Sequence, residues 1–163
     1  MTASMVFVVD DDDAVRASIL NLLAAEGFEA RGFAAGTAFI GASRPDTAAC
    51  LVCDMKMPEL GGLEVAAEMA RQGSDMPIIF MTGFGSIPMT VQAMKAGAIE
   101  FLTKPVAPDE LLRAVRDGLR TDEANLAARR ETAQLRQRLS SLTPRERETM
   151  ELVIGGLLNK QVA

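Results

Sequence analysis

Acidic residues directly follow apolar runs at two points of this 163-residue sequence. Four aspartates stand at positions 10–13, and Asp54 ends a later apolar run. Four adjacent carboxylates repel one another, so this run favours the binding of a positive group. If Asp10, Asp11 and Asp54 converge, they form a site for a hard cation. Oxygen ligands without histidine or thiolate indicate Mg²⁺, with Mn²⁺ as the alternative.

Two further residues would complete a site for phosphoryl transfer. Thr82 ends another apolar run and offers a hydroxyl, and Lys104 follows the next run and offers an ammonium group. A divalent cation beside a carboxylate, with a lysine and a hydroxyl to hold further oxygens, supplies the positioning and charge neutralisation that phosphoryl transfer requires. In this arrangement Asp54 is the expected nucleophile.

The elements that must position these residues alternate between two kinds of pattern. Segments with helical spacing of apolar residues separate five runs that read as strands, at 6–9, 29–33, 50–53, 78–81 and 99–102. Uninterrupted apolar strands joined by helices are typical of a parallel sheet that is covered on both faces. The predicted fold is therefore α/β, with a doubly wound five-stranded parallel sheet. Ligands bind such sheets at the carboxyl ends of the strands.

The composition excludes several classes of protein. The chain has 48% hydrophobic residues, enough for one domain of usual size plus an extension. It contains no histidine, so the usual general base and Ser-His or Cys-His nucleophile pairs are absent. Its apolar stretches are too short for a membrane span and its N-terminus does not read as a signal peptide. We therefore expect a cytoplasmic protein without a membrane partner.

Cys50 and Cys53 have the C-x-x-C spacing of some metal and redox sites. Both lie in an expected strand, where residues three apart point to opposite faces. One metal ion or one disulfide cannot readily use both. We predict that they are small core residues.

The pattern changes after residue 108, where the chain becomes rich in Ala, Leu, Arg and Glu. Leu112, Leu119 and Leu126 recur every seven residues, but Ala133 breaks the repeat, so a sustained coiled coil is weakly supported. We expect a charged linker helix that pairs briefly with a second copy. Nine of the ten basic residues after 108 are arginine. They form either a solvated helix face or a nucleic-acid surface.

A second helix is predicted to begin at Thr143, because Thr143, Pro144 and Glu146 match a capping box with proline at the first helical position. We expect this helix to end at 155–156 and a further helix to begin near 159. The inward-facing residues of the helix that begins at Thr143 would be Met150, Leu152 and Val153.

Taken together, the motifs at 8–11, 54–58, 81–83 and 103–105 resemble those of the receiver domain of two-component response regulators. The resemblance covers residues 5 to about 120 and implies a flavodoxin-like fold with strand order 2-1-3-4-5. The segment from 142 to 163 resembles the start of a LuxR-type helix-turn-helix domain. The chain is therefore similar to the NarL/FixJ subfamily of transcriptional regulators.

The resemblance assigns a role to each site residue. It makes Asp54 the phosphoacceptor, Asp11 a direct Mg²⁺ ligand and Asp10 a ligand through water. The main-chain carbonyl of Lys56 would be a further metal ligand.

The same resemblance implies which residues bind the phosphoryl group and which aromatic residue changes position on phosphorylation. Thr82 and Lys104 would hold phosphoryl oxygens, and Phe101 would be the switch aromatic. The bond between Lys104 and Pro105 would be cis, as is common in the family.

The resemblance also implies partners and a domain plan. A sensor histidine kinase would phosphorylate the receiver at 1–120, which would then form a homodimer through its fourth-helix to fifth-helix face. Residues 121–141 would be a linker helix and 142–163 the first part of a DNA-binding domain. The full-length protein is expected to bind DNA, whereas 163 residues without a recognition helix are not expected to read DNA sequence.

Three residues near the site receive local predictions. Asp13 is expected to be the N-cap of the first helix and Asp12 a solvated bystander. Phe84 is hypothesised to slow loss of the phosphoryl group by excluding water.

The main expectation is a phospho-acceptor that is not an enzyme. The alternatives are an Mg²⁺-dependent phosphatase with Asp54 as turnover nucleophile, and an interaction module with vestigial acids.

Overall fold

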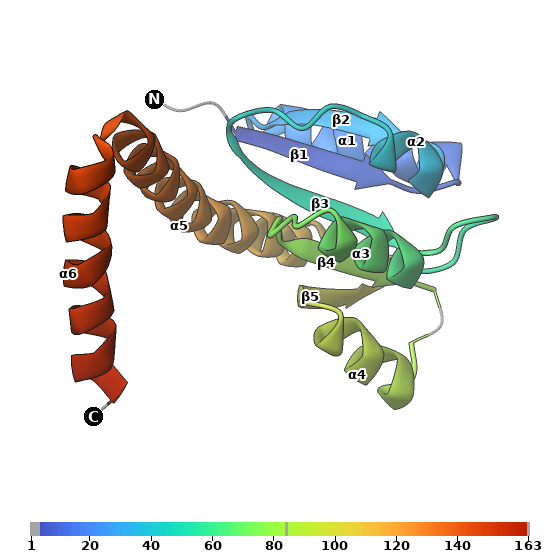
Figure 1. Ribbon diagram of the computed structural model, residues 1–163. Coiled ribbons are helices and arrows are strands. Elements are labelled where there is room, and N and C mark those ends of the chain that lie inside the picture. The colour runs from blue at the N-terminus through green and yellow to red at the C-terminus, as the bar shows by residue number, and fades with distance from the viewer. Residues whose placement is uncertain (1–3, 84, 163) are drawn as a thin grey trace. The chain divides into compact units, whose positions relative to one another are not determined.

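The computed structural model describes residues 4–83 and 85–162, and of residues 150 and 156–162 only the backbone. Its centre is a parallel five-stranded sheet with the order β2-β1-β3-β4-β5, as predicted (Figure 1). The strands are β1 (Ser4–Val9), β2 (Glu29–Phe33), β3 (Ala48–Asp54), β4 (Ile78–Thr82) and β5 (Ala98–Thr103). Every residue of β3 and β4 is buried, which explains their unbroken apolar runs.

Helices cover both faces of the sheet (Figure 1). One face packs against α1 (Asp13–Ala25) and the first part of α5 (Pro108–Ser141). The other face packs against α2 (Gly36–Ile40), α3 (Gly62–Arg71) and α4 (Ile87–Lys95). The alternation of strands and helices thus gives a three-layer fold.

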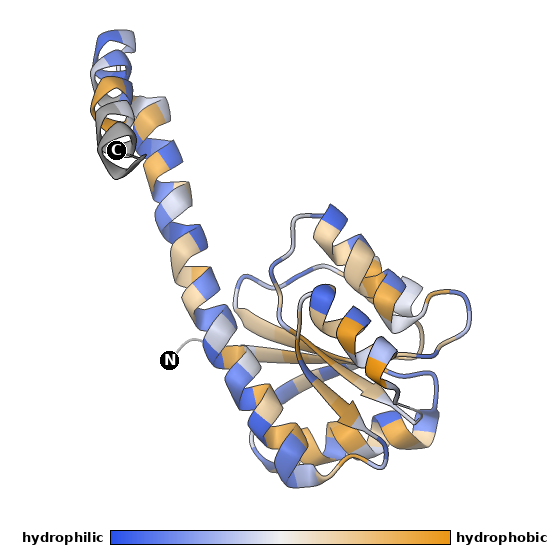
Figure 2. Cartoon of the chain, turned by 90° about the horizontal axis from the view of Figure 1, so that it is seen from below, coloured by the Kyte–Doolittle hydropathy of each residue, from blue (hydrophilic) through white to orange (hydrophobic). Residues whose placement is uncertain are grey.

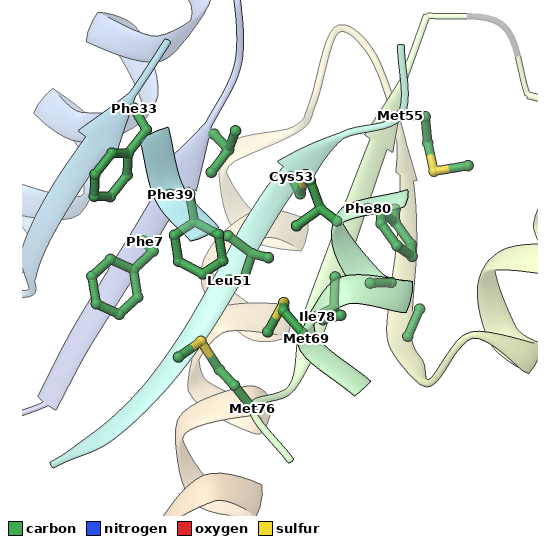
Figure 3. Packing of buried hydrophobic residues seen from close by; sticks show 14 of the residues in the cluster. Phe7, Phe33, Phe39, Leu51, Cys53, Met55, Met69, Met76, Ile78 and Phe80 are labelled. Carbon is green, nitrogen blue, oxygen red and sulfur yellow. The ribbon is translucent and has the colours of Figure 1, made fainter. Parts of the chain in front are cut away.

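An aromatic cluster fills the sheet face beneath α2 (Figure 3). Phe7, Phe33 and Phe39 have ring centroids 5.5–6.2 Å apart in tilted and edge-to-face arrangements. These geometries suit the charge distribution of aromatic rings. The cluster joins β1, β2 and α2 into one packed unit.

Cys50 and Cys53 are buried and belong to the cores on opposite faces of the sheet. Burial raises the pKa of the Cys50 thiol to about 12, with the charge of Asp122 adding to the effect. Burial also raises the pKa of the Cys53 thiol, with the nearby Asp54 adding to it. Both thiols therefore stay protonated, and the prediction of small core residues is confirmed.

The leucines that repeat every seven residues in α5 have a local explanation. Leu112, Leu119 and Leu126 are buried in the same unit as the sheet. Their spacing places them on one helix face, and Leu112 and Leu119 pack into the core on one face of the sheet. A coiled coil is not needed to account for them. Figure 2 shows hydrophobic residues concentrated on the strands and many hydrophilic residues along α5.

The chain divides into two compact units, one up to Leu126 and one from Ala127 onward. The second unit contains the end of α5 and α6 (Pro144–Val162). α6 begins where predicted, because Thr143 accepts from the N–H of Glu146 at 3.2 Å. The linker and helix-turn-helix boundaries at 120, 121–141 and 142–163 stay predictions.

Two expectations about α6 are wrong. The helix continues through Gly155 and its neighbour to Val162, because two glycines lower helix propensity without removing any backbone hydrogen-bonding group. Leu152 and Val153 are mostly exposed, and none of the described side chains from Ala127 onward is buried. The side chain of Met150 lies outside the described residues. In the part of the chain that is described, no helix combines the length and apolarity needed to cross a membrane.

Candidate functional site

Three of the predicted site residues converge at the carboxyl edge of the sheet. β1 and β3 are parallel neighbours, with Val9 opposite Cys53, so Asp10 and Asp54 leave adjacent strand ends. One carboxylate oxygen from each of Asp10, Asp11 and Asp54 lies within 4.8 Å of the other two. The sheet topology therefore brings together acids that are more than forty positions apart in the sequence.

Asp10 is fully buried and its carboxylate is held on both oxygens. Its Oδ1 accepts from the main-chain N–H of Asp12 at 2.9 Å, and its Oδ2 accepts from Lys104 Nζ at 2.8 Å. A buried carboxylate is costly unless it is paired and hydrogen-bonded. These two contacts explain how Asp10 can lie inside the protein.

Lys104 joins the two strand ends of the site. Its Nζ lies 2.8 Å from Asp10 and 3.4 Å from Asp54 Oδ1. Burial lowers the pKa of the ammonium group, but the hydrogen bond and charge of Asp10, together with Asp54, outweigh this and raise the pKa above its usual value. Lys104 is therefore charged across the physiological pH range. The bond between Lys104 and Pro105 is cis, as the resemblance predicts.

Asp54 is the last residue of β3 and has little contact with solvent. Burial raises the pKa of its carboxyl group, and repulsion by Asp10 raises it further. Lys104 and a hydrogen bond from the main chain of Lys56 act in the opposite direction without cancelling the shift. The site therefore carries more negative charge than Lys104 offsets, and a further cation would relieve it.

The donor set fits a hard divalent cation. The oxygens come from carboxylates, and Asp11 is exposed, which leaves room for water in the coordination shell. Mg²⁺ in proteins is usually held by one or two carboxylates and keeps several waters. The side chain of Lys56 is exposed, so it is the main chain of this residue that faces the site. The role of its carbonyl as a ligand stays a prediction.

The start of α3 lies against the end of β3, and Gly62 makes this possible. A Cβ atom at Gly62 would come within 2.8 Å of the carbonyl oxygen of Asp54 and 3.1 Å of Met55 Cα. Both neighbours are main-chain atoms that cannot easily move. Glycine at this position therefore keeps the backbone beside Asp54 tightly packed.

Thr82 and Phe101 lie beside one another near the same edge. Thr82 is buried at the end of β4, and its hydroxyl lies 3.9 Å from the sulfur of Met89 on α4. Phe101 is partly buried and packs against the core beneath α4. A Cβ atom at Gly85 would lie 3.5 Å from the Phe101 ring and 3.6 Å from Thr82 Cγ2. The two side chains thus border one small space.

The predicted N-cap of α1 is off by one residue. Asp12 caps the helix, because its Oδ1 accepts from the N–H groups of Ala14 and Val15 at 2.9 and 3.1 Å. Asp13 is the first helical residue, and Asp12 is therefore not a bystander. Adjacent aspartates satisfy the sequence rule equally well, and only the backbone angles at Asp12 decide between them. Phe84 lies outside the described residues, so its hypothesised role stays untested.

One residue beside the site has no place in the sequence motifs. Arg16 of α1 donates to the main-chain oxygen of Asp10 at 2.7 Å and to Asp13 Oδ1 at 2.5 Å. Its guanidinium group therefore holds both ends of the acidic loop. The available signals were its helical spacing from Asp13 and a glycine, Gly32, in the strand beside it.

The phosphatase alternative is not favoured by the surroundings of the site. Among residues 4–83 and 85–162, the segments that leave the carboxyl ends of the strands are short and lead directly into helices. None of these described segments is long enough to cover a substrate.

Comparison with known proteins agrees with this geometry. The family model for the response regulator receiver domain matches residues 6–116. Nodulation protein W of Bradyrhizobium diazoefficiens is 44% identical over 162 residues, covering 99% of this chain and 71% of that protein. The transcriptional regulatory protein FixJ of the same organism is 39% identical, covering 99% and 79% of the two chains.

Solved structures show the same fold. The response regulator StyR superposes with a TM-score of 0.84 at 46% sequence identity, covering 99% of this chain and 81% of that one. Full-length FixJ from B. japonicum gives a TM-score of 0.67 at 38% identity, covering 100% and 80%. From the matched family model and these relatives, we conclude that the chain belongs to the response regulator receiver domain family.

Proposed function

We propose that this protein is the receiver of a two-component phosphorelay, in which Asp54 accepts a phosphoryl group from a sensor histidine kinase. The observation that carries the proposal is the convergence of Asp10, Asp11 and Asp54 with Lys104 at one edge of the sheet. Three acids and a lysine that contacts two of them provide a nucleophile, a metal site and a counter-charge together. The protein acts as a phospho-acceptor with at most slow self-dephosphorylation, not as a turnover enzyme.

The proposed reaction is an in-line displacement at phosphorus. A carboxylate oxygen of Asp54 forms the new P–O bond while the P–N bond to the kinase histidine breaks, and the imidazole keeps the electron pair. Lys104 neutralises charge on the phosphoryl oxygens, and the hydroxyl of Thr82 donates to one of them. Bound Mg²⁺, or Mn²⁺, would neutralise further charge on these oxygens. Asp11 would hold the cation directly, Asp10 through water.

The main-chain carbonyl of Lys56 is the remaining proposed ligand. The main-chain N–H of Lys56 donates to the carboxylate of Asp54, so the backbone of this residue lies beside the site and supports this choice.

We further propose that phosphorylation changes the packing of Phe101. When Thr82 moves toward a phosphoryl oxygen, Phe101 can enter the space that both side chains border. The face formed by α4, β5 and α5 would then support a homodimer. Apolar residues of α4 that are exposed in this structure, namely Ile87, Val91 and Met94, support this choice of face.

The proposed output is control of transcription. Three relatives have names that describe regulators: TmoT and TodT are named response regulator proteins, and FixJ is named a transcriptional regulatory protein. We place the chain in the NarL/FixJ subfamily and propose that 142–163 begins a LuxR-type helix-turn-helix domain. A full-length protein would bind DNA through that domain. A kinase partner of this type implies a cytoplasmic location.

The decisive experiment measures the intact mass of the protein after incubation with acetyl phosphate and Mg²⁺. The unaltered protein should gain one phosphoryl group, and Asp54→Asn should gain none. Omission of Mg²⁺ should prevent the gain. Phosphorylation of both proteins, or of neither, would contradict the assignment of Asp54. Repeated turnover of a small phosphoester would instead favour the phosphatase.

A further inference from the structure

We propose that Arg16 is a positioning residue for the metal site, and that it acts by fixing the peptide unit between Asp10 and Asp11. This inference rests on the proposed function, because it assumes that these aspartates hold Mg²⁺. Arg16 Nη1 donates to the main-chain oxygen of Asp10 at 2.7 Å, and Nη2 donates to Asp13 Oδ1 at 2.5 Å. One guanidinium group thus holds the acidic loop at its beginning and at its end.

The contact at the Asp10 carbonyl controls the orientation of Asp11. The carbonyl of Asp10 and the N–H of Asp11 belong to one planar peptide unit, so a fixed carbonyl also fixes the direction in which Asp11 leaves the strand. Asp11 is exposed, and within residues 4–83 and 85–162 no hydrogen bond holds its carboxylate. Its placement in the metal-free protein therefore depends on its backbone.

Other contacts hold the rest of the acidic loop, and they do not involve the carbonyl of Asp10. The N–H of Asp10 donates to the carbonyl of Phe33 on β2 at 3.2 Å, which fixes the first residue to the sheet. The N–H of Asp12 donates to Asp10 Oδ1, and the Asp12 carboxylate caps α1. Between these two anchors, the carbonyl of Asp10 is held by Arg16.

The side chain of Arg16 is itself guided into place by β2. Its stem runs over Gly32, where an added Cβ atom would lie 3.1 Å from Arg16 Cδ and 2.8 Å from Leu20 Cδ1. The side chain is only 18% exposed, so few other conformations are open to it. A glycine in the strand and an arginine on the helix therefore form one supporting arrangement behind the acidic loop.

Charge and geometry predict opposite effects for Arg16. A positive charge near a cation site weakens binding, whereas a donor that orients a ligand strengthens it. Lysine keeps the charge but cannot form the planar two-pronged contact with a carbonyl and a carboxylate. Arg16→Lys therefore removes the geometric contribution and leaves the electrostatic one.

The first test is calorimetric titration of the full chain with MgCl₂. We expect Arg16→Lys to bind Mg²⁺ roughly tenfold more weakly than the unaltered protein, the low end of the range for groups that support a metal ligand. The matched control is Arg120→Lys, because Arg120 pairs with an aspartate three residues earlier on α5 but does not contact the acidic loop. The control should bind Mg²⁺ as the unaltered protein does.

The second test uses the metal-free protein, so it does not depend on activity or on metal binding. Hydrogen exchange of the Asp12 amide, which donates to Asp10 Oδ1, should be roughly tenfold faster in Arg16→Lys, because the loop opens more easily. Gly32→Ala, which displaces the arginine stem without changing any charge, should shift both measurements in the same direction. It also provides a test if Arg16→Lys does not fold.

The outcomes separate this inference from the proposed function. If the unaltered protein does not bind Mg²⁺, the proposed metal site is wrong. If it binds Mg²⁺ and Arg16→Lys binds as tightly or more tightly, with unchanged amide exchange, the metal site stands and the role of Arg16 is refuted.

Discussion

Two fully buried aspartates at opposite edges of the same sheet show how differently one residue type can be used. Asp10 lies at the carboxyl edge, and Asp122 of α5 lies at the amino end of β3. Asp122 accepts from the N–H of Ala49 at 2.8 Å and lies 3.5 Å from Arg44 Nη2. Both carboxylates are paired with a cation and with a main-chain N–H, so burial alone does not distinguish them.

The neighbours of the two aspartates make the difference. Around Asp122, Arg44 also binds Ser74 at 2.6 Å and lies 3.6 Å from Asp75, and these contacts join loops that precede two strands. Around Asp10 the additional neighbours are two more carboxylates. At the amino edge one arginine faces two carboxylates, of which Asp75 is partly exposed to solvent. At the carboxyl edge one lysine faces three clustered carboxylates, so the excess of negative charge is larger there and favours a cationic ligand. A buried acid indicates function when its surroundings leave its charge uncompensated.

The largest expected effect concerns the amino edge. Asp122→Ala should lower the free energy of unfolding by about 3 kcal/mol, because it leaves the buried N–H of Ala49 without its acceptor and removes one of the acceptors of the partly buried Arg44 guanidinium group. Urea unfolding followed by far-UV circular dichroism measures this, since the chain has no tryptophan or tyrosine to report by fluorescence.

The matched control is Asp117→Ala, which removes a half-exposed aspartate that pairs with Arg120 on the same helix. Its cost should stay below about 0.5 kcal/mol. A loss in Asp122→Ala as small as in the control would show that the cluster at the amino edge is not structural.

The next effect concerns the edge with excess charge. Mg²⁺ at about a hundred times its dissociation constant should stabilise the unaltered protein by about 2.7 kcal/mol, because only the folded chain brings the ligands together. Asp11→Asn should lose most of this gain and Asp122→Asn none of it. Thermal unfolding with and without MgCl₂ measures both. Equal stabilisation of all three proteins would place the bound cation elsewhere.

A smaller effect distinguishes the two edges by its sign. In the metal-free protein at pH 7, Asp54→Asn should raise the free energy of unfolding by about 1 kcal/mol, because it removes a charge that burial and Asp10 disfavour. Asp122→Asn should instead lower it. Chemical unfolding in the presence of EDTA measures the difference. A loss of stability in Asp54→Asn would mean that the contact with Lys104 outweighs the repulsion.

The pH dependence of this effect follows from the raised pKa of Asp54. The folded protein binds a proton at this group more readily than the unfolded chain, so the unaltered protein loses stability as the pH rises from the ordinary aspartate value of 3.8 through the raised pKa. The advantage of Asp54→Asn should therefore be complete at neutral pH and shrink as the pH falls. A constant advantage across this range would contradict the shift.

The smallest effect is expected for Arg44→Gln. The side chain is 30% exposed, so water can replace part of its contact with Asp122, and glutamine can still donate one hydrogen bond. We expect a cost of about 0.5 kcal/mol and an unchanged affinity for Mg²⁺. Urea unfolding and calorimetric titration check the two halves of this expectation.

Much of the fold and the candidate site could be predicted because their signals are local. The ends of the apolar runs placed Asp10, Asp54, Thr82 and Lys104 at strand ends, and the alternation of strands and helices predicted their shared edge. The seven-residue repeat of leucines was ambiguous, because packing on a sheet and packing in a coiled coil need similar spacing. The tertiary structure resolves it for Leu112 and Leu119, which are buried in the core on one face of the sheet.

The residue types and their spacing were enough to predict the strands and the groups available for chemistry, and the family resemblance supplied the strand order. Three features appear only in the folded chain: the acid that caps α1, the arginine that supports the acidic loop, and the neighbours of each buried aspartate. The physical reason is that these features depend on main-chain groups. Every residue has a main-chain carbonyl, and every residue except proline has a main-chain N–H, so no residue type marks the carbonyl of Asp10 or the N–H of Ala49 as special. Only the folded backbone shows that Arg16 contacts the first and Asp122 the second.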